Sequence, residues 1–156
     1  MFKTIVLALD GSKGSDRVVP LGVALAKENE GRLVIAHADE QAVGRGGASS
    51  HVLERDVESQ LRELAHQISD DEGVETTFEV RNVMLGGPAP AIVEIADEAG
   101  ADLILCGTRG HSPVGGLLLG SVAQRLLHIA HQPLLVVPES ASVPAADSAR
   151  NEAAQA

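Results

Sequence analysis

Short apolar segments alternate with segments of helical periodicity along this chain, and that alternation restricts the fold more than any other feature. Strands are predicted at four runs rich in Val, Ile, Leu and Ala, namely residues 3–9, 32–38, 102–107 and 134–137, and at the alternating run of residues 76–81. Four stretches with apolar residues at helical spacing lie between them, beginning after Ser15 or Asp16, at Ser49 or Ser50, after Pro88, and at Ser121. Such alternation predicts an α/β fold, in which right-handed crossovers build a twisted parallel sheet with helices on both faces.

The length and the composition of the last segment indicate one domain followed by a tail. A chain of 156 residues suits a single core. After Pro138 the residues are small or charged, and Val143 is the only large aliphatic residue among them. We therefore expect a domain over residues 1–138 and a flexible tail over residues 139–156.

Charge and composition disfavour several classes of function. The net charge is −10 and only 1% of residues are aromatic, so the chain lacks both the basic surface and the stacking rings typical of nucleic-acid binding. No apolar run approaches the roughly 20 residues that a membrane span requires, and Asp10 interrupts the first apolar run too early for a signal peptide. With one cysteine, no disulfide can form within the chain. We expect a cytoplasmic protein without nucleic-acid or membrane partners.

A glycine-rich loop at residues 107–121 follows the predicted fourth strand and opens the last helix. In an open parallel sheet, ligands bind beyond the carboxyl ends of the strands, where such loops lie. Glycines let the backbone approach an anion, and the free amides at the start of a helix point at it with a favourable dipole. The loop therefore predicts a phosphate site.

Two familiar nucleotide motifs do not fit this chain. A Walker loop requires lysine after its second glycine, and Ser121 stands at that place after Gly120. The first turn, at residues 11–14, lacks the three spaced glycines of a dinucleotide site, which disfavours a nicotinamide dehydrogenase.

The glycine spacing resembles that of the universal stress proteins. Their ATP-binding members carry Gly-x2-Gly-x9-Gly-(Ser/Thr), which Gly107, Gly110, Gly120 and Ser121 match without a gap. The similarity extends over residues 2–138 and includes IVLALDGS at residues 5–12, His37-Ala38, and PLLVVP at residues 133–138.

This resemblance implies a Rossmann-like sheet of the adenine nucleotide alpha hydrolase type, with strand order 3-2-1-4-5. It also implies ATP as the ligand, with Mg²⁺ held by the phosphates rather than by a side-chain cluster. Asp10 would lie on the ribose or metal side, and the backbone of Ala8 and Ala38 would contact adenine. The ribose and phosphates would be bound by Gly107, Gly110, Gly120, Ser121 and Val122. Arg109, at a variable position of the motif, is placed to reach a phosphate oxygen. Members of the family commonly dimerise through the last strand, here Leu134–Val137.

Three functions fit these observations. The first is an ATP-binding regulator of a stress response, acting as a homodimer on a protein partner that the sequence does not identify. The second is a slow ATPase or phosphotransferase at the same site, although we assign no catalytic residue and no metal-ligating side chain. The third is a dimeric interaction module without nucleotide. Asp10 has a simpler alternative role as a turn or capping residue, and Cys106 and His37 are expected to be buried packing residues.

Overall fold

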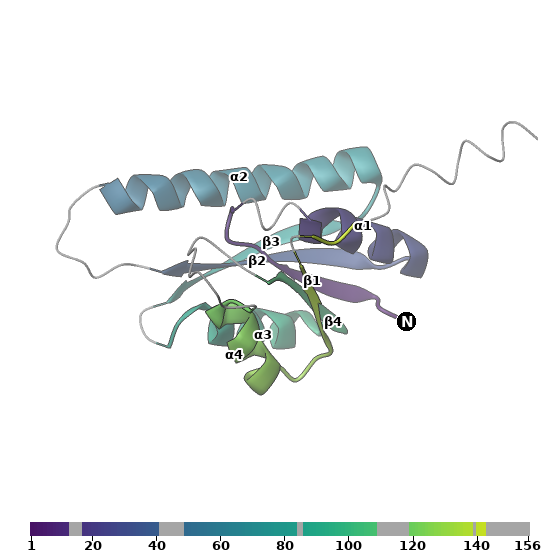
Figure 1. Cartoon of the computed structure of the whole chain (residues 1–156). Helices are drawn as coiled ribbons and strands as arrows, with labels where there is room; N and C mark the ends of the chain where they lie inside the picture. Colours follow the sequence, from purple (N-terminus) through teal and green to yellow (C-terminus); the bar gives the residue numbers. More distant parts are fainter. Residues whose placement is uncertain (13–16, 41–48, 84–85, 109–118, 139, 143–156) are drawn as a thin grey trace, which may run out of the picture.

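The computed structural model describes residues 1–12, 17–40, 49–83, 86–108, 119–138 and 140–142, with the backbone alone at residues 40 and 49–54. Figure 1 shows the chain as a sheet between two layers of helices. In chain order the elements are β1 (Thr4–Ala8), α1 (Val18–Asn29), β2 (Arg32–Glu40), α2 (Ser49–Glu72), β3 (Thr76–Val83), α3 (Pro88–Ala99), β4 (Leu103–Gly107), α4 (Ser121–Ile129) and β5 (Leu134–Val137). No helix of the described ranges is both long and apolar enough to cross a membrane.

The strands form one parallel sheet in the order β3-β2-β1-β4-β5, which confirms the expected fold class and strand order. β1 lies in the middle, with Ala8 paired to Ala36 of β2 on one side and to Cys106 of β4 on the other. Helices α1 and α2 cover one face, and α3 and α4 cover the other (Figure 1). β1 is therefore shielded on both edges and both faces.

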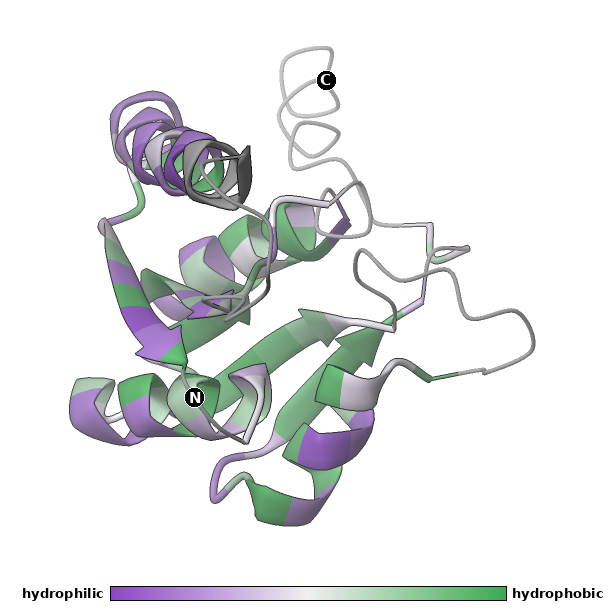
Figure 2. Cartoon of the chain, turned by 90° about the vertical axis from the view of Figure 1, so that its left-hand side faces the viewer, coloured by the Kyte–Doolittle hydropathy of each residue, from purple (hydrophilic) through white to green (hydrophobic). Residues whose placement is uncertain are grey.

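Alternating side chains of the strands supply two separate apolar cores. Ile5 and Leu7 of β1 pack with Val18 of α1 and Leu61 of α2, whereas Val6 packs on the opposite face. That second core combines residues of β2, β4, α3 and α4, namely Val34, Ile104, Ile92 and Leu126. Figure 2 shows the result, with apolar central strands in the interior and polar residues on the outer sides of the helices and in the edge strand β3. Because a strand points successive side chains to opposite faces, fully apolar runs are what a sheet covered on both sides requires.

Two strands extend further than the sequence predicts. Asp39 and Glu40, expected in a loop, continue β2 and pair with Asn82 and Val83 of β3. β3 likewise runs two residues beyond the expected Arg81. The cause is the pairing itself, because backbone hydrogen bonds between neighbouring strands hold polar residues in a strand as well as apolar ones.

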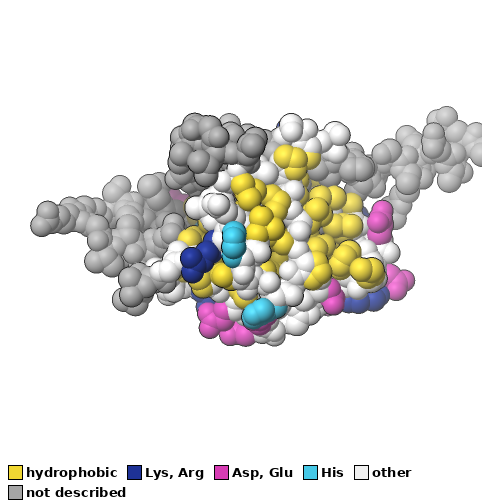
Figure 3. Space-filling model, turned by 60° about the horizontal axis from the view of Figure 1, so that its bottom comes forward, with side chains coloured by type: hydrophobic (Ala, Val, Ile, Leu, Met, Phe, Trp, Pro, Cys, Tyr) yellow, Lys and Arg dark blue, Asp and Glu magenta, His cyan; other side chains and the backbone are white. Residues whose placement is uncertain are grey.

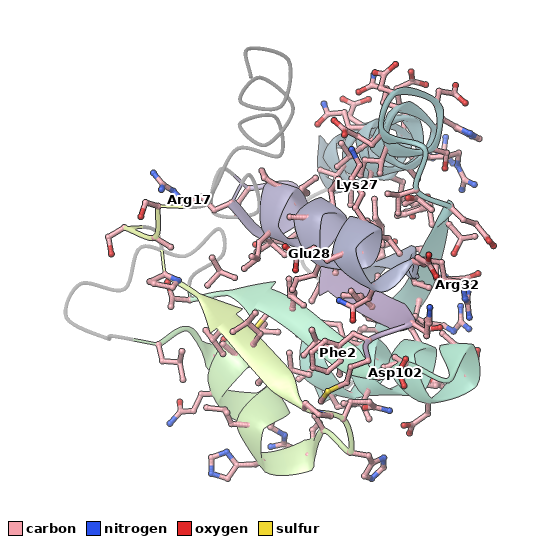
Figure 4. All side chains as sticks on the ribbon, turned by 90° about the vertical axis from the view of Figure 1, so that its right-hand side faces the viewer. Phe2, Arg17, Lys27, Glu28, Arg32 and Asp102 are labelled. Carbon is pink, nitrogen blue, oxygen red and sulfur yellow. The ribbon has the colours of Figure 1, made fainter. Side chains whose placement is uncertain are left out.

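Asp102 connects the starts of β1 and β4 at the amino-terminal edge of the sheet. Its Oδ2 accepts hydrogen bonds from the backbone N–H groups of Lys3 (2.8 Å) and Thr4 (2.9 Å). These bonds favour the carboxylate and lower the pKa of Asp102. Asp102 was expected as the first residue of the strand, but β4 begins one residue later, at Leu103. Figure 4 shows Asp102 beside Phe2 at this edge.

The chain after β5 returns to the start of α1. The Arg17 guanidinium donates to the carbonyl oxygen of Ala141 (2.5 Å), and Ala141 packs against the first core. Figure 4 shows Arg17 next to this segment. Arg17 is also the N-cap of α1 and makes no side-chain capping bond. The expected capping residues, Ser15 and Asp16, lie outside the described residues.

Candidate functional site

The carboxyl ends of β1 and β4 lie side by side in the centre of the sheet. Ala8, the last residue of β1, is paired with Cys106, and Gly107 is one residue further along β4. The chain leaves β1 for α1 on one face and leaves β4 for α4 on the other face. This divergence creates the switch point at which open parallel sheets bind their ligands.

Asp10 forms a tight turn directly after β1. Its Oδ1 accepts a hydrogen bond from the Ser12 N–H (3.0 Å), which is the local turn role that the sequence left as an alternative. Gly11 has φ +74°, and a Cβ at this position would lie 2.8 Å from Cγ1 of Val57 in α2. Only glycine therefore allows the turn to pass beneath α2.

The backbone of Ala38 faces the end of β1. Leu9 N–H donates to the carbonyl of Ala36 (3.0 Å), so this peptide group of β2 points towards β1. Peptide groups alternate in direction along a strand, and Ala38 is two residues further on. Its N–H and C=O consequently point to the same side as those of Ala36, beyond the Ala8–Ala36 pair. The Ala38 backbone therefore lies beside the space beyond the end of β1, where it was predicted to contact the ligand.

The two ends of the glycine motif are held together by a backbone hydrogen bond. The N–H of Thr108 donates to the carbonyl of Val137 in β5 (3.1 Å). The carbonyl of Thr108 in turn accepts a hydrogen bond from the N–H of Gly120 (2.6 Å). Because Thr108 faces β5, the preceding Gly107 faces β1. The end of β4 at Thr108 and the start of α4 at Gly120 are thus held in contact, although they are 12 positions apart in the sequence.

The first turn of α4 presents backbone donors without a side-chain cap. Gly120 is the N-cap, and the first helical bond runs from Gln124 N–H to the Gly120 carbonyl (2.9 Å). The N–H groups of Ser121, Val122 and Ala123 precede that bond, and a helix supplies no acceptor for them. Gly120 has a φ of −68°, which any residue can adopt, so the backbone conformation does not require glycine at this position. Space for a close ligand is a better explanation for it.

The structure thus collects most of the expected site residues at one edge. Ala8, Asp10, Ala38 and Gly107 lie at the carboxyl ends of three adjacent strands, and Gly120 with the first turn of α4 is tied to them through Thr108. Arg109 and Gly110, also expected in the site, lie outside the described residues.

Buried polar groups surround this edge on the α2 side. His37 is buried, and its Nδ1 donates to the Leu9 carbonyl (2.9 Å), which confirms its expected packing role. The Ser12 Oγ and Asp39 Oδ1 atoms are buried and have no hydrogen-bond partner within the described ranges. Buried polar atoms normally have hydrogen-bond partners, so these two atoms are exceptions that lie just beyond β1 and near the end of β2. Neither Ser12 nor Asp39 was predicted as a site residue.

The buried cysteine and the distribution of possible metal ligands bear on the chemistry of this site. Cys106 is 3% exposed, and burial raises the pKa of its thiol to about 12, so the thiol stays protonated at neutral pH. Within the parts of the chain that the structure describes, no three His, Cys, Asp or Glu side chains gather as metal ligands would.

A hollow of about 710 Å³ adjoins the first turn of α4. We call it the α3–α4 groove. Its described lining comprises residues 86–89 at the start of α3 and, along α4, Ser121, Val122, Gln124, Arg125, His128 and Ile129. Only Ser121 and Val122 were expected in the site. In the sequence, Arg125 and His128 can be related to Ser121 by their spacing, because residues 121, 125 and 128 lie on one side of a helix.

Comparison with known proteins identifies the relatives of this chain. The model of the "Universal stress protein family" matches residues 1–138. A universal stress protein of Thermus aquaticus is 36% identical over 139 residues, which cover 88% of this chain and 99% of that protein. One from Bacillus subtilis, YxiE, is 29% identical over 150 residues, covering 88% of this chain and 99% of the relative.

Solved structures agree in fold. A crystal structure of a universal stress protein family member from Burkholderia pseudomallei superposes with a TM-score of 0.71 at 27% identity, covering 87% of this chain and 96% of that one. A universal stress protein crystallised in complex with cAMP has a TM-score of 0.62 at 30% identity, covering 87% and 97% of the two chains.

Proposed function

The chain belongs to the universal stress protein family, and we propose on this basis that it binds an adenine nucleotide at the carboxyl ends of β1 and β4. We further propose that it acts as a cytoplasmic regulator that responds to this nucleotide. The observation that carries this proposal is the hydrogen bond from Gly120 N–H to the Thr108 carbonyl (2.6 Å). It brings the first turn of α4 to the end of β4, where a ligand can contact both. The relative in complex with cAMP supports an adenine nucleotide as the ligand.

The phosphates are assigned to the first turn of α4. The N–H groups of Ser121 and Val122 supply donors, and the positive end of the helix dipole attracts the anion. Such an interaction contributes about 0.3–1 kcal/mol for each charge and up to ~2 kcal/mol where it is partly buried. A few of them together account for micromolar to millimolar binding without a Walker lysine.

The nucleoside is assigned to the space beyond β1. The peptide groups of Ala38 and Gly107 face that space from opposite sides, and a base edge requires such backbone donors and acceptors. Asp10 and the unpartnered hydroxyl of Ser12 lie at the turn that borders it, where ribose hydroxyls are suitable partners. We propose ATP as the nucleotide, with Mg²⁺ held by its phosphate oxygens.

We also propose a homodimer joined through β5. Leu135 is 38% exposed on this edge strand, and Leu127 of α4 is 58% exposed. Figure 3 shows apolar side chains gathered on the face that α4 and β5 form. The opposite edge strand, β3, instead carries Arg81 in an ion pair with Glu98. Charged edges resist pairing with another chain, whereas apolar edges favour it. A dimer would extend the sheet across β5 and leave the carboxyl ends of β1 and β4 accessible.

The nucleotide site is tested by titration calorimetry of the full chain with ATP, ADP and AMP, before and after Gly120→Val. The wild type is expected to bind at micromolar to millimolar concentration. Valine fits the backbone angles of Gly120, so the fold should survive. Its side chain would occupy the volume that a phosphate needs, and binding should be lost.

Gln60→Val is the matched control, because it introduces the same side chain at an exposed position of α2. Circular dichroism verifies that both variants are folded. If Gly120→Val kept its ATP affinity within about twofold of wild type, the phosphates would not lie at α4.

A further inference from the structure

The α3–α4 groove continues from the first turn of α4 along the helix towards its carboxyl end. Ser121, Arg125 and His128 line it at positions i, i+4 and i+7, which lie on one side of a helix. With a rise of about 1.5 Å per residue, this stripe is roughly 10 Å long. The volume of about 710 Å³ is within the range typical of small-molecule sites, roughly 300–1,000 Å³. The groove is thus larger than one phosphate group requires.

The polar side chains of the groove can receive an anion. Arg125 is exposed and makes no ion pair or hydrogen bond within the part of the chain that the structure describes. The Nδ1–H of His128 donates to the Gln124 carbonyl (2.8 Å), which orients the ring on the helix surface. The described lining includes no Asp or Glu. The chain as a whole has a net charge of −10, so most of its surface repels anions. A groove lined by arginine and histidine without acidic residues can attract an anion in spite of that net charge.

The opposite wall of the groove offers few donors. Pro88, at the first position of α3, has no backbone N–H, so the lining residues of this wall offer only the backbone N–H groups of Gly86, Gly87 and Ala89 as donors. Gly87, the N-cap of α3, provides no side-chain bond either. An anion in the groove would therefore bind mainly to the α4 wall, where Arg125 is the strongest donor.

The helix dipole explains why side-chain cations are needed there. The dipole acts over the first turn only, so it attracts an anion at Ser121 and Val122 but not one further along α4. Arg125 lies one helical turn after Ser121, and its side chain supplies a positive charge where the helix dipole no longer attracts an anion. Its guanidinium can bind two phosphate oxygens at once.

We propose that the α3–α4 groove binds the distal phosphates of a nucleoside polyphosphate, and that Arg125 makes the chain prefer long phosphate chains over AMP. This inference rests on the proposed function, because the proximal phosphate is placed at the first turn of α4. Ser121 and Val122 belong to both regions, so one phosphate chain can extend from the first into the second without leaving the protein surface.

The test is titration calorimetry of the full chain with AMP, ATP and adenosine 5′-tetraphosphate, comparing wild type with Arg125→Gln. The wild type should bind ATP and the tetraphosphate more tightly than AMP. Arg125→Gln should weaken both polyphosphates about tenfold and leave AMP within about twofold. Arg125→Lys should fall between the two, because lysine keeps the charge but not the two-pronged hydrogen bond.

Arg55→Gln on α2 is the control, since it removes the same charge from an exposed position outside the groove. It should change none of the three affinities. An equal loss of AMP and ATP binding in Arg125→Gln would place Arg125 at the proximal phosphate and overturn the inference. Unchanged ATP binding in that variant, with loss in Gly120→Val, would overturn the inference and leave the proposed function intact. A wild-type chain that binds none of these nucleotides would overturn both.

Discussion

At the scale of single residues, burial determines what the one thiol of the chain can do. Cys106 lies in β4 directly before Gly107, next to the candidate site, and packs in the core shared with α3 and α4. Burial disfavours the charged form, which raises its pKa from 9.0 to about 12. The residue therefore acts as a small apolar group, as predicted from the sequence, and not as a nucleophile.

This pKa shift predicts a loss of stability in alkaline solution. In the unfolded chain the thiol ionises near its ordinary pKa of 9.0, whereas in the folded chain it keeps its proton up to about 12. The folded state therefore binds more protons between these values, and the free energy of unfolding falls as pH rises above 9.0. The contribution of Cys106 to that slope is at most about 1.4 kcal/mol per pH unit.

Urea denaturation of wild type and Cys106→Ala at a series of pH values measures this contribution. The variant should be less stable at neutral pH because a buried side chain is shortened, but its stability should decline less steeply above pH 9.0. Parallel slopes for the two proteins would show that Cys106 ionises equally in the folded and unfolded states.

At the scale of elements, the two edges of the sheet differ in what they can contact. β3 exposes Thr77, Glu79 and Asn82 along its length, and it carries the ion pairs of Arg81. β5 is a four-residue apolar strand, with Leu135 its most exposed large side chain. An unpaired apolar edge favours association, and a short strand limits the number of registers in which two copies can pair.

We expect Leu135→Lys to convert the dimer into a monomer. Leucine at this position is already partly exposed, so lysine should be tolerated in the monomer, while two lysines facing each other across a paired edge would repel. Light scattering coupled to size exclusion gives the mass. Thr77→Lys, on the opposite edge strand, is the control and should remain dimeric. A wild-type protein that is monomeric at high concentration would refute the dimer, and a Leu135→Lys dimer would refute this edge.

At the scale of the whole molecule, the candidate site joins both halves of the sheet. Ala38 belongs to the β2 side, Gly107 to the β4 side, and α4 is tied to β4 through Thr108. A ligand that contacts all of them bridges elements from both cores, so its binding free energy should add to the stability of the entire fold rather than to one loop.

Nucleotide binding should therefore raise the melting temperature of wild type. At a free concentration 100 times its dissociation constant, a ligand stabilises the folded state by about 2.7 kcal/mol. For a chain of this size that corresponds to roughly 5–10 °C. Differential scanning fluorimetry with and without ATP measures the shift, and Gly120→Val should show none. An equal shift in both proteins would indicate binding elsewhere or a nonspecific effect.

Local patterns determined the element types and the place of the glycine motif. Apolar runs and helical spacing depend on neighbouring residues, so the sequence alone predicted the α/β class, the limits of β5 and the start of α4 at Ser121. The spacing from Gly107 to Ser121 indicated a phosphate loop in the same way, and the family resemblance supplied the strand order that the structure confirms.

Tertiary structure decided what depends on contacts between distant segments. The extension of β2 through Asp39 and Glu40 depends on β3, and the role of Asp102 depends on the backbone of Lys3 and Thr4, nearly a hundred positions earlier. The α3–α4 groove exists because the start of α3 packs beside α4. The spacing of residues 121, 125 and 128 places them on one side of α4, but it does not show which other element they face. Periodicity indicates to which side of its own helix or strand a side chain points. The groups that it contacts depend on how distant segments pack together in the folded chain.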